Sequence, residues 1–221
     1  LNVADLVAFH RRSGAQATIS TTPVDDPSQF GIVETDADGR VLRFVEKPQP
    51  GETKSRFASA GTYVMEESTL ALMPGTEKLS IERVTFPQLV ADGTLFAMAT
   101  NDYWIDAGRP DTYVQANCDI AAQLRNSADA AVHADAVVAG SAIVHDAVVS
   151  AKVNIGENAR VSNSVLLDGA VIGSGAVVER SIVMGNIGND ARIVDCIVGP
   201  TGVVQSGQAS TGGRFPEGEI S

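Results

Sequence analysis

The chain has 221 residues, enough for one large domain or two modest ones with a sizeable buried core. Its formal net charge of −11 disfavours general binding to nucleic acid or to anionic membranes. The sequence is too apolar for a disordered chain, yet no apolar run is long enough to span a bilayer. Cys118 and Cys196 are too few for a disulfide framework or a zinc site. We therefore expect a globular protein of the reducing cytoplasm, without nucleic-acid or membrane partners.

The first part of the sequence alternates helix-like and strand-like segments. An amphipathic helix is expected near residues 2–13, followed by a strand near 17–23. The sequence DADG at 36–39 lies between two apolar runs, which predicts the turn of a β-hairpin. Three further segments are a strand FASAGTYVM at 57–65, a helix SIERVTFPQLVADG at 80–93 and a strand LFAMATNDYWIDAG at 95–108. Such alternation is typical of an α/β sheet.

The composition changes near Tyr113. Ten of the 11 aromatic residues lie at or before this position, and none lies from Val114 to Arg214. A connecting helix is expected over residues 112–128. We divide the chain into a first domain at 1–113, a linker helix at 114–130, a repeat domain at 131–208 and a C-terminal tail at 209–221.

The second part is an internal repeat. Three units align without gaps, namely IGENARVSNSVLL from residue 155, IGSGAVVERSIVM from 172 and IGNDARIVDCIVG from 187. A looser unit, VHADAVVAGSAIV, begins at Val132. An aliphatic side chain recurs at every sixth residue, as at Ile155, Val161 and Leu167. This hexapeptide pattern predicts a left-handed parallel β-helix with triangular coils of about 18 residues, too narrow for aromatic side chains. An ordinary β-sandwich is the alternative.

Four segments carry a resemblance to a known family. In chain order they are GIVETDADGRVLRFVEKP, SAGTYVM, SIERVTFPQLVADG and YWIDAGRP. This order resembles the second half of the catalytic domain of sugar-1-phosphate nucleotidyltransferases, with the closest likeness to the mannose-1-phosphate guanylyltransferase type. A hexapeptide β-helix after that domain is similar to the same family. The resemblance implies the C-terminal half of a Rossmann-like α/β nucleotidyltransferase domain followed by a left-handed parallel β-helix.

Two family features do not occur in the sequence. The family begins with a Gly-rich GGxGTR-type nucleotide loop and carries a first metal-binding Asp midway through the domain, and neither is found here. We therefore expect that roughly the first hundred residues of the protein are missing. We also expect the 221-residue chain alone to be inactive.

Glu46 and Lys47 are the first candidate site residues. They end a predicted strand at Pro48, which stops sheet pairing at a place where α/β ligand sites usually form. Adjacent strand residues face opposite sides, so both can reach one ligand only if the strand breaks there. The resemblance assigns Glu46 to the sugar hydroxyls and Lys47 to the sugar phosphate. A surface ion pair beside a turn is the alternative.

Gly31 and Gly61 stand at strand positions where a side chain is expected. Close approach of a ligand is one cause, and a bulge is the other. The family resemblance favours contact with the sugar. The family form near Gly61 is Asn-Ala-Gly, and Ser59 stands here in the position of the Asn. Gly31, Ser59 and Gly61 therefore join the substrate-binding candidates.

Asp106 is the candidate metal ligand. It lies between apolar residues in WIDAG, and a buried Asp needs a partner such as Mg²⁺ with phosphate oxygens. The resemblance makes Asp106 one of two magnesium-binding carboxylates, and a turn or N-cap role before Pro110 is the alternative. Glu82 and Arg83 lie at an expected helix start that Ser80 can cap, where a structural role weighs at least as much as a functional one.

The reaction implied by the resemblance is attack by a sugar-1-phosphate oxygen on the α-phosphorus of a nucleoside triphosphate. Lys47, Asp106 and Mg²⁺ would serve by positioning and charge neutralisation, and no general base is needed. GTP and GDP-mannose are favoured by overall likeness, and a homo-oligomer is expected through the β-helix. A noncatalytic regulatory or scaffold homologue is one alternative. A β-helix acyltransferase using His133 or His145 as its base is another, although both lie at the ragged first coil.

Overall fold

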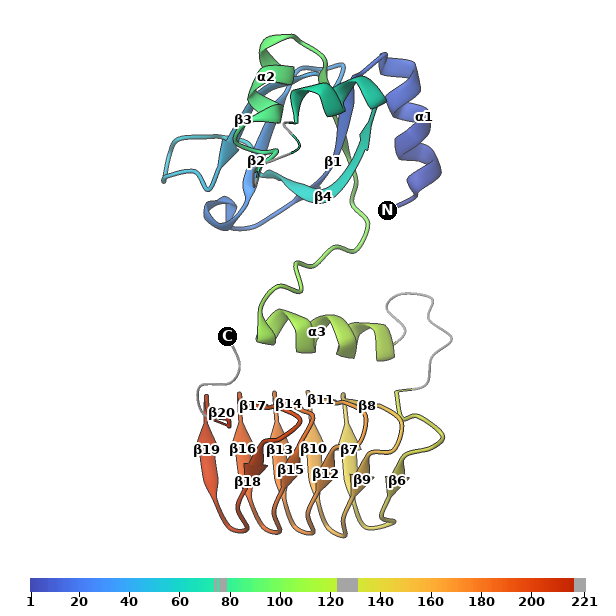
Figure 1. The fold of residues 1–221 in the computed structure, drawn as a ribbon, viewed down its shortest axis with the longest axis vertical. Helices are drawn as coiled ribbons and strands as arrows, with labels where there is room; N and C mark the ends of the chain where they lie inside the picture. Colours follow the sequence, from blue (N-terminus) through green and yellow to red (C-terminus); the bar gives the residue numbers. More distant parts are fainter. Residues whose placement is uncertain (74, 76–78, 123–130, 217–221) are drawn as a thin grey trace. The chain divides into compact units, whose positions relative to one another are not determined.

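The computed structural model describes residues 1–73, 75, 79–122 and 131–216. The chain divides into two compact units, Leu1–Trp104 and Ile105–Ser221 (Figure 1). The division precedes the boundary that we expected after residue 113. None of the described helices is both long and apolar enough to cross a membrane.

The first unit is built on one five-stranded sheet with the order β3-β2-β4-β1-β5. Strands β1 and β5 are parallel, whereas the other neighbours are antiparallel. In chain order the elements are α1 (Val3–Ser13), β1 (Ala17–Pro23), the 3-10 helix η1 (Pro27–Gln29), β2 (Gly31–Thr35), β3 (Val41–Glu46), β4 (Phe57–Met65), the 3-10 helix η2 (Glu67–Leu72), α2 (Thr85–Ala91) and β5 (Leu95–Ala99). The expected helix, hairpin and the strands at 17–23 and 57–65 are all present.

Two elements of this unit are shorter than we expected. Helix α2 begins at Thr85, because residues 81–84 form turns in which the Ser80 carbonyl accepts the N–H groups of Arg83 and Val84. No side chain caps α2, so the predicted cap by Ser80 is wrong. Strand β5 ends at Ala99, after which the Thr100 hydroxyl donates to the Asp102 carboxylate at 2.7 Å and accepts the Asp102 N–H at 3.0 Å. Local bonds of this kind compete with strand pairing.

The second unit consists of helix α3 (Pro110–Ala121) and a parallel β-solenoid of five coils. Three five-stranded sheets form its sides, and α3 packs on β8 and β11. The strands are β6 (Val137–Val138), β7 (Ile143–His145), β8 (Val148–Val149), β9 (Asn154–Ile155), β10 (Arg160–Ser162), β11 (Val165–Leu166), β12 (Val171–Ile172), β13 (Val177–Glu179), β14 (Ile182–Val183), β15 (Asn186–Ile187), β16 (Arg192–Val194), β17 (Ile197–Val198), β18 (Val203–Val204), β19 (Ala209–Thr211) and β20 (Arg214–Phe215). Residues 123–130 of the expected linker helix lie outside the described part.

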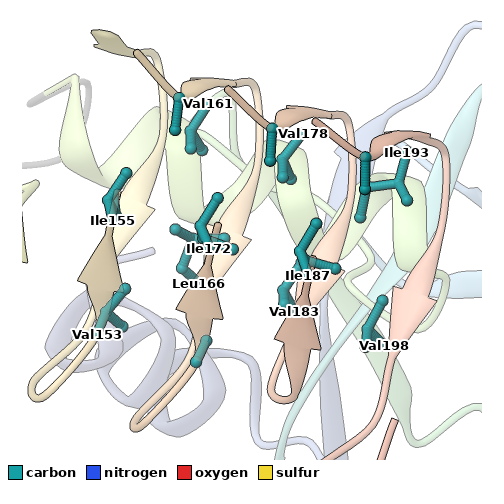
Figure 2. Close-up of a cluster of buried hydrophobic side chains, with 14 of the residues drawn as sticks. Val153, Ile155, Val161, Leu166, Ile172, Val178, Val183, Ile187, Ile193 and Val198 are labelled. Carbon is teal, nitrogen blue, oxygen red and sulfur yellow. The ribbon is translucent and has the colours of Figure 1, made fainter. Parts of the chain in front are cut away.

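Aliphatic side chains fill the interior of the solenoid, as the hexapeptide pattern predicted. On the third side, however, the fully buried residue is Leu166 rather than the expected Leu167, which is only half-buried. Figure 2 shows the inward side chains stacked from coil to coil. One column holds Val161, Val178 and Ile193, and a second holds Ile155, Ile172 and Ile187. All six are at most 2% exposed. Burial of such columns is the main source of solenoid stability, because each coil covers its neighbour. The handedness of the solenoid stays a prediction.

The coils are slightly shorter than the 18 residues that we expected. Val137, Asn154 and Val171 pair in register, so one coil takes 17 residues. The coil from Val171 to Asn186 takes only 15. Val138, rather than Val132, pairs with Ile155, so the expected alignment of the first unit was displaced by one hexad. The displacement arose because the hexads at Val132 and Val138 both begin with a valine, so the sequence does not show which side of the triangle each one forms.

The solenoid also extends farther than we expected. Strands β19 and β20 pair with the preceding coil, although the expected tail began at residue 209. The Ile197 N–H donates to the Gly213 carbonyl at 2.9 Å, and the Gly199 N–H donates to the Phe215 carbonyl at 2.7 Å. Polar and glycine residues replace the aliphatic pattern in this coil, so backbone pairing rather than periodicity reveals it.

Candidate functional site

The β2–β3 hairpin brings two of the predicted site residues face to face. Gly31 pairs with Glu46 in the antiparallel register. A Cβ atom added at Gly31 would lie 2.5 Å from Cζ of Phe44 and 2.9 Å from Oε2 of Glu46. Phe44 and Glu46 are two residues apart on β3, so their side chains share one face of the sheet. The missing side chain at Gly31 therefore makes room for its cross-strand neighbours, a cause that the sequence alone did not suggest.

Strand β3 breaks between Glu46 and Lys47, as the sequence predicted. The backbone φ of Lys47 is 51°, a left-handed value that costs an ordinary residue roughly 1–2 kcal/mol. The Lys47 N–H donates to the Phe30 carbonyl at 3.0 Å, which fixes the turn, and the next residue, Pro48, is buried. The Lys47 side chain is exposed, and Glu46 is half-buried. The break frees this lysine from the alternation that would place it on the face opposite Glu46.

A bulge in β4 explains Gly61. Ile19 pairs with Tyr63 and Thr21 pairs with Ser59, so β4 carries extra residues between these two pairs. Gly61 lies in the bulge with a φ of 73°, and a Cβ atom there would meet no atom within 4 Å. The neighbouring Ala60 carbonyl accepts the Trp104 indole N–H at 3.0 Å. The structure thus supports the bulge, and contact of Gly61 with a sugar stays a prediction.

Ser59 lies in a group of polar side chains that no sequence pattern brought together. Its hydroxyl is 3.3 Å from the hydroxyl of Tyr63. Burial raises the pKa of Tyr63, and the negative charges of Glu82 and Glu46 raise it further. The hydrogen bond with Ser59 acts in the opposite direction on this pKa. The phenol is therefore protonated at neutral pH.

Sequence reasoning missed Tyr63 and left Glu82 undecided. Tyr63 belongs to the SAGTYVM motif, and alternation places it on the same face as Ser59, but in an extended strand residues four apart are separated by roughly 13 Å. The bulge between them shortens this distance, and no sequence pattern predicted it. Glu82 comes from a turn almost twenty residues farther along the chain. Only the tertiary packing of that turn against β4 brings the two together.

Asp106 belongs to the second unit, whereas the other predicted site residues belong to the first. Its side chain is exposed, so the expectation of a buried carboxylate in need of a partner is wrong. Its Oδ1 accepts the Gly108 N–H at 3.0 Å, which gives the turn role direct support. Within the described residues, no three His, Cys, Asp or Glu side chains gather as a metal site. Ligation of Mg²⁺ by Asp106 stays a prediction.

His133 and His145 are both exposed and lie beside acidic neighbours. Nδ1 of His145 is 3.0 Å from Oδ2 of Asp146, and Nδ1 of His133 is 3.8 Å from Oδ2 of Asp135. These are sequence neighbours at the first coil. The geometry offers no specific support for the acyltransferase alternative.

Comparison of the chain with known proteins identifies its family. A family model described as Nucleotidyl transferase matches residues 1–123, more than half of the chain. The chain belongs to the nucleotidyl transferase family. A second model, described as GlmU-like C-terminal hexapeptide, matches residues 112–188 and overlaps the solenoid. The family expected from the four motifs and the repeat is therefore confirmed.

Curated relatives of this nucleotidyl transferase share one name. A mannose-1-phosphate guanylyltransferase of Mycobacterium tuberculosis is 34% identical over 128 residues, which cover 57% of this chain and 35% of the relative. A catalytic subunit beta of mannose-1-phosphate guanylyltransferase from Drosophila pseudoobscura is 37% identical over 120 residues, covering 54% and 32%. A probable mannose-1-phosphate guanylyltransferase of rice is 38% identical over 131 residues, covering 58% and 35%. The chain spans about a third of the length of these relatives.

Proposed function

We propose that this nucleotidyl transferase acts on a sugar 1-phosphate and a nucleoside triphosphate, and that the chain carries the sugar-phosphate-binding part. GDP-mannose is the favoured product, because the relatives bear the name mannose-1-phosphate guanylyltransferase. The observation that carries the proposal is the break of β3, which leaves Lys47 in a turn directly after Glu46, the residue that pairs with Gly31. Association into a homo-oligomer through the solenoid stays a separate prediction.

Glu46 and Lys47 would divide the recognition of the sugar phosphate between them. A carboxylate accepts hydrogen bonds from sugar hydroxyls, each worth roughly 1.5–3 kcal/mol when one partner is charged. A lysine ammonium is a compact charge that suits a phosphate. Because Lys47 is exposed and Glu46 is half-buried, the phosphate would lie toward solvent and the sugar toward the sheet.

The chemistry then requires positioning more than covalent help. An ionised oxygen of the sugar phosphate bonds to the α-phosphorus of the triphosphate, and the bond from that phosphorus to the bridging oxygen breaks. Pyrophosphate leaves with the bond electrons. Lys47 would hold the attacking phosphate and reduce its repulsion from the triphosphate. No side chain needs to remove a proton, because the attacking phosphate is already ionised.

Asp106 offers the donor type that Mg²⁺ prefers. This ion is usually held by one or two carboxylates together with substrate phosphates. Asp106 is exposed and engages Gly108 through Oδ1, so its carboxylate suits a shared site of this kind better than an all-protein cage. Mg²⁺, when bound, would neutralise charge on the phosphates.

Pyrophosphate release tests the proposal. The natural polypeptide, with any sequence that flanks these 221 residues, is incubated with each pair of four nucleoside triphosphates and several sugar 1-phosphates. We expect release only when both substrates are present, and most release with GTP and mannose 1-phosphate. A correctly folded protein that releases no pyrophosphate with any pair of substrates would overturn the proposal and favour the noncatalytic homologue.

A further inference from the structure

The sheet of the first unit closes on itself at one end. Its outer strands are β3 and β5, and the turn before β3 folds back onto β5. The Ala97 N–H donates to the Gly39 carbonyl at 2.7 Å, and Arg40 forms an isolated antiparallel bridge with Phe96. Gly39 has a φ of 84°, and a Cβ atom there would lie 2.8 Å from the Ala97 carbonyl oxygen. Glycine therefore permits this contact, and the closed end of the sheet resembles a short barrel.

A cavity of about 770 Å³ is lined by β1, β2, β5 and the connection that precedes β4. Its volume is typical of a site for a small molecule, which measures roughly 300–1,000 Å³. Val33, Ala97 and Ala99 form apolar parts of its wall, and the two short side chains of β5 leave the space open. The cavity is distinct from the candidate sugar-phosphate site. None of its lining residues is one of the substrate-binding candidates Gly31, Glu46, Lys47, Ser59 and Gly61.

Thr21 of β1 places a buried hydroxyl at this cavity. The residue lines the cavity and is only 2% exposed. Another hydroxyl of the same strand has a partner, since the Ser20 hydroxyl donates to the Thr62 carbonyl at 3.2 Å. Within the described part of the chain, the Thr21 hydroxyl forms no hydrogen bond. Buried polar groups without a partner are rare in folded proteins, because their desolvation is not compensated. A ligand in the cavity would supply the missing partner.

Glu34 of β2 offers a hydrogen-bond acceptor to the same cavity. It is half-buried, and its Oε1 accepts the Thr53 hydroxyl at 2.6 Å and lies 3.9 Å from Nη1 of Arg43. Among the described residues, no hydrogen bond reaches its Oε2. The Ser55 hydroxyl donates to the Val33 carbonyl at 2.6 Å, so the connection that forms this wall is held to β2. The acceptor is therefore preorganised before any ligand binds.

Phe57 supplies an aromatic surface. The residue is 41% exposed and lines the cavity. A flat aromatic ring packs well against the apolar C–H face of another ring. Thr21 and Glu34 lie on different strands, so a ligand that reaches both must present hydroxyl groups in more than one direction. A pyranose ring does this, whereas a nucleobase presents its polar groups only within its own plane.

We propose that this cavity is a second carbohydrate site, which binds an uncharged pyranose ring. The ring lies against Phe57, one of its hydroxyls bonds to the Thr21 hydroxyl, and another donates to the Glu34 carboxylate. A threonine hydroxyl can donate or accept, so it tolerates either orientation of the sugar hydroxyl. The inference goes beyond the proposed function and does not depend on it, because the cavity contains none of the residues assigned to the sugar 1-phosphate.

Calorimetric titration with sugars that carry no phosphate tests this site. The natural polypeptide is titrated with methyl α-mannoside and methyl α-glucoside, and with sorbitol as a polyol that has no ring. We expect at least one glycoside to bind with a millimolar Kd and sorbitol not to bind. Thr21→Val should weaken glycoside binding roughly threefold to tenfold, the effect of losing one hydrogen bond. Ala99→Leu should abolish it, because the larger side chain fills the cavity.

Thr22→Val is the matched control. Thr22 is 4% exposed on the same strand, faces the other side of the sheet and does not line the cavity, so this variant should bind the glycoside as the parent does. Thr21→Val removes no hydrogen bond within the described chain, so it should not lower the thermal midpoint. A midpoint lowered by more than a few degrees would show that the Thr21 hydroxyl has a partner in the protein and would refute the proposal.

The remaining outcomes are equally decisive. Absence of glycoside binding, or equal binding by the parent, Thr21→Val and Ala99→Leu, refutes the second site. Loss of glycoside binding in Glu46→Gln shows that the sugar occupies the candidate sugar-phosphate site instead. Binding of guanosine that Thr21→Val weakens, without glycoside binding, shows that the cavity takes a nucleobase. If Thr21→Val does not fold, Ala99→Leu decides the matter, because Ala99 is exposed and its replacement leaves the core unchanged. None of these results bears on pyrophosphate release, so the proposed function is tested separately.

Discussion

Lys47 makes the proposal about sugar-phosphate recognition testable at a single position. Its side chain is exposed beyond the break in β3, so truncation should not disturb the core. We expect Lys47→Ala to raise KM for the sugar 1-phosphate roughly tenfold to a hundredfold, since one charge-assisted hydrogen bond is lost. The KM for the nucleotide should move much less. Lys54→Ala, at an exposed lysine of the β3–β4 connection, is the control. A rise confined to the nucleotide KM would show that Lys47 binds the triphosphate instead.

Asp106 allows the turn role and the metal role to be separated, because Asn can also accept the Gly108 N–H. Asp106→Asn should therefore leave the thermal midpoint unchanged. If the carboxylate holds Mg²⁺, turnover should fall roughly a hundredfold or more, equivalent to about 3 kcal/mol of transition-state stabilisation. A turnover number within twofold of the parent value leaves the turn as the only role of Asp106.

The raised pKa of Tyr63 leads to a prediction of how the stability of the fold changes at alkaline pH. Its pKa in the folded chain lies above the ordinary value of 10.0, chiefly because of burial. The folded chain therefore holds this proton more tightly than the unfolded chain does. The resulting stabilisation is fully present below pH 10 and is lost as the pH rises through the folded pKa. Chemical unfolding between about pH 9 and 11 should show a steeper loss of stability in the parent than in Tyr63→Phe, and parallel curves would contradict the assignment.

The conformation of a single residue could be predicted wherever it depended on the residues next to it in the sequence. The strand break at Glu46 and Lys47 followed from Pro48 alone. The packing of Phe44 over Gly31 depends on cross-strand register, which no local pattern contains. The exposure of Asp106 was mispredicted, because apolar neighbours in the sequence do not ensure burial. The group around Tyr63 required the tertiary position of the turn at residues 81–84.

At the scale of elements, the short coil of the solenoid depends on one glycine. The connection from β14 to β15 is two residues shorter than the one from β11 to β12. A Cβ atom at Gly185 within it would lie 2.2 Å from the Gly202 carbonyl oxygen and 2.5 Å from that of Gly199. Both atoms belong to the backbone of the next coil, so they cannot move aside as a flexible side chain would.

Gly185→Ala should therefore destabilise the adjoining coils by about 1–3 kcal/mol, the usual cost of overpacking. Hydrogen exchange of the amides in β14 to β18 should accelerate accordingly. Gly140→Ala is the matched control, because a Cβ atom there meets nothing within 4 Å. Equal protection in the two variants would show that the short connection tolerates a side chain.

The solenoid was predictable from periodicity because each coil repeats the same packing problem. The aliphatic columns at Ile155 and Val161 are where the pattern placed them. The side of the triangle that each hexad forms could not be predicted, since the pattern is the same on all three sides. The limits of the solenoid could not be predicted either. The last coil was missed because main-chain hydrogen bonds, rather than aliphatic residues, define it.

For the whole molecule, the family could be predicted because four motifs and a repeat occur in a specific order, and the family match confirms it. The identity of the substrates is a proposal, since the chain spans only about a third of the length of its curated relatives. The central claim is that the first unit binds a sugar 1-phosphate through Glu46 and Lys47.

Calorimetric titration of the 221-residue chain with mannose 1-phosphate tests this claim most directly, with mannose and inorganic phosphate as separate controls. Because sugar and phosphate contacts would act together on one ligand, we expect mannose 1-phosphate to bind more tightly than either control. Lys47→Ala should abolish the advantage that the phosphate gives. Failure of mannose 1-phosphate to bind, or equal binding by the parent and the Lys47→Ala variant, would contradict the claim.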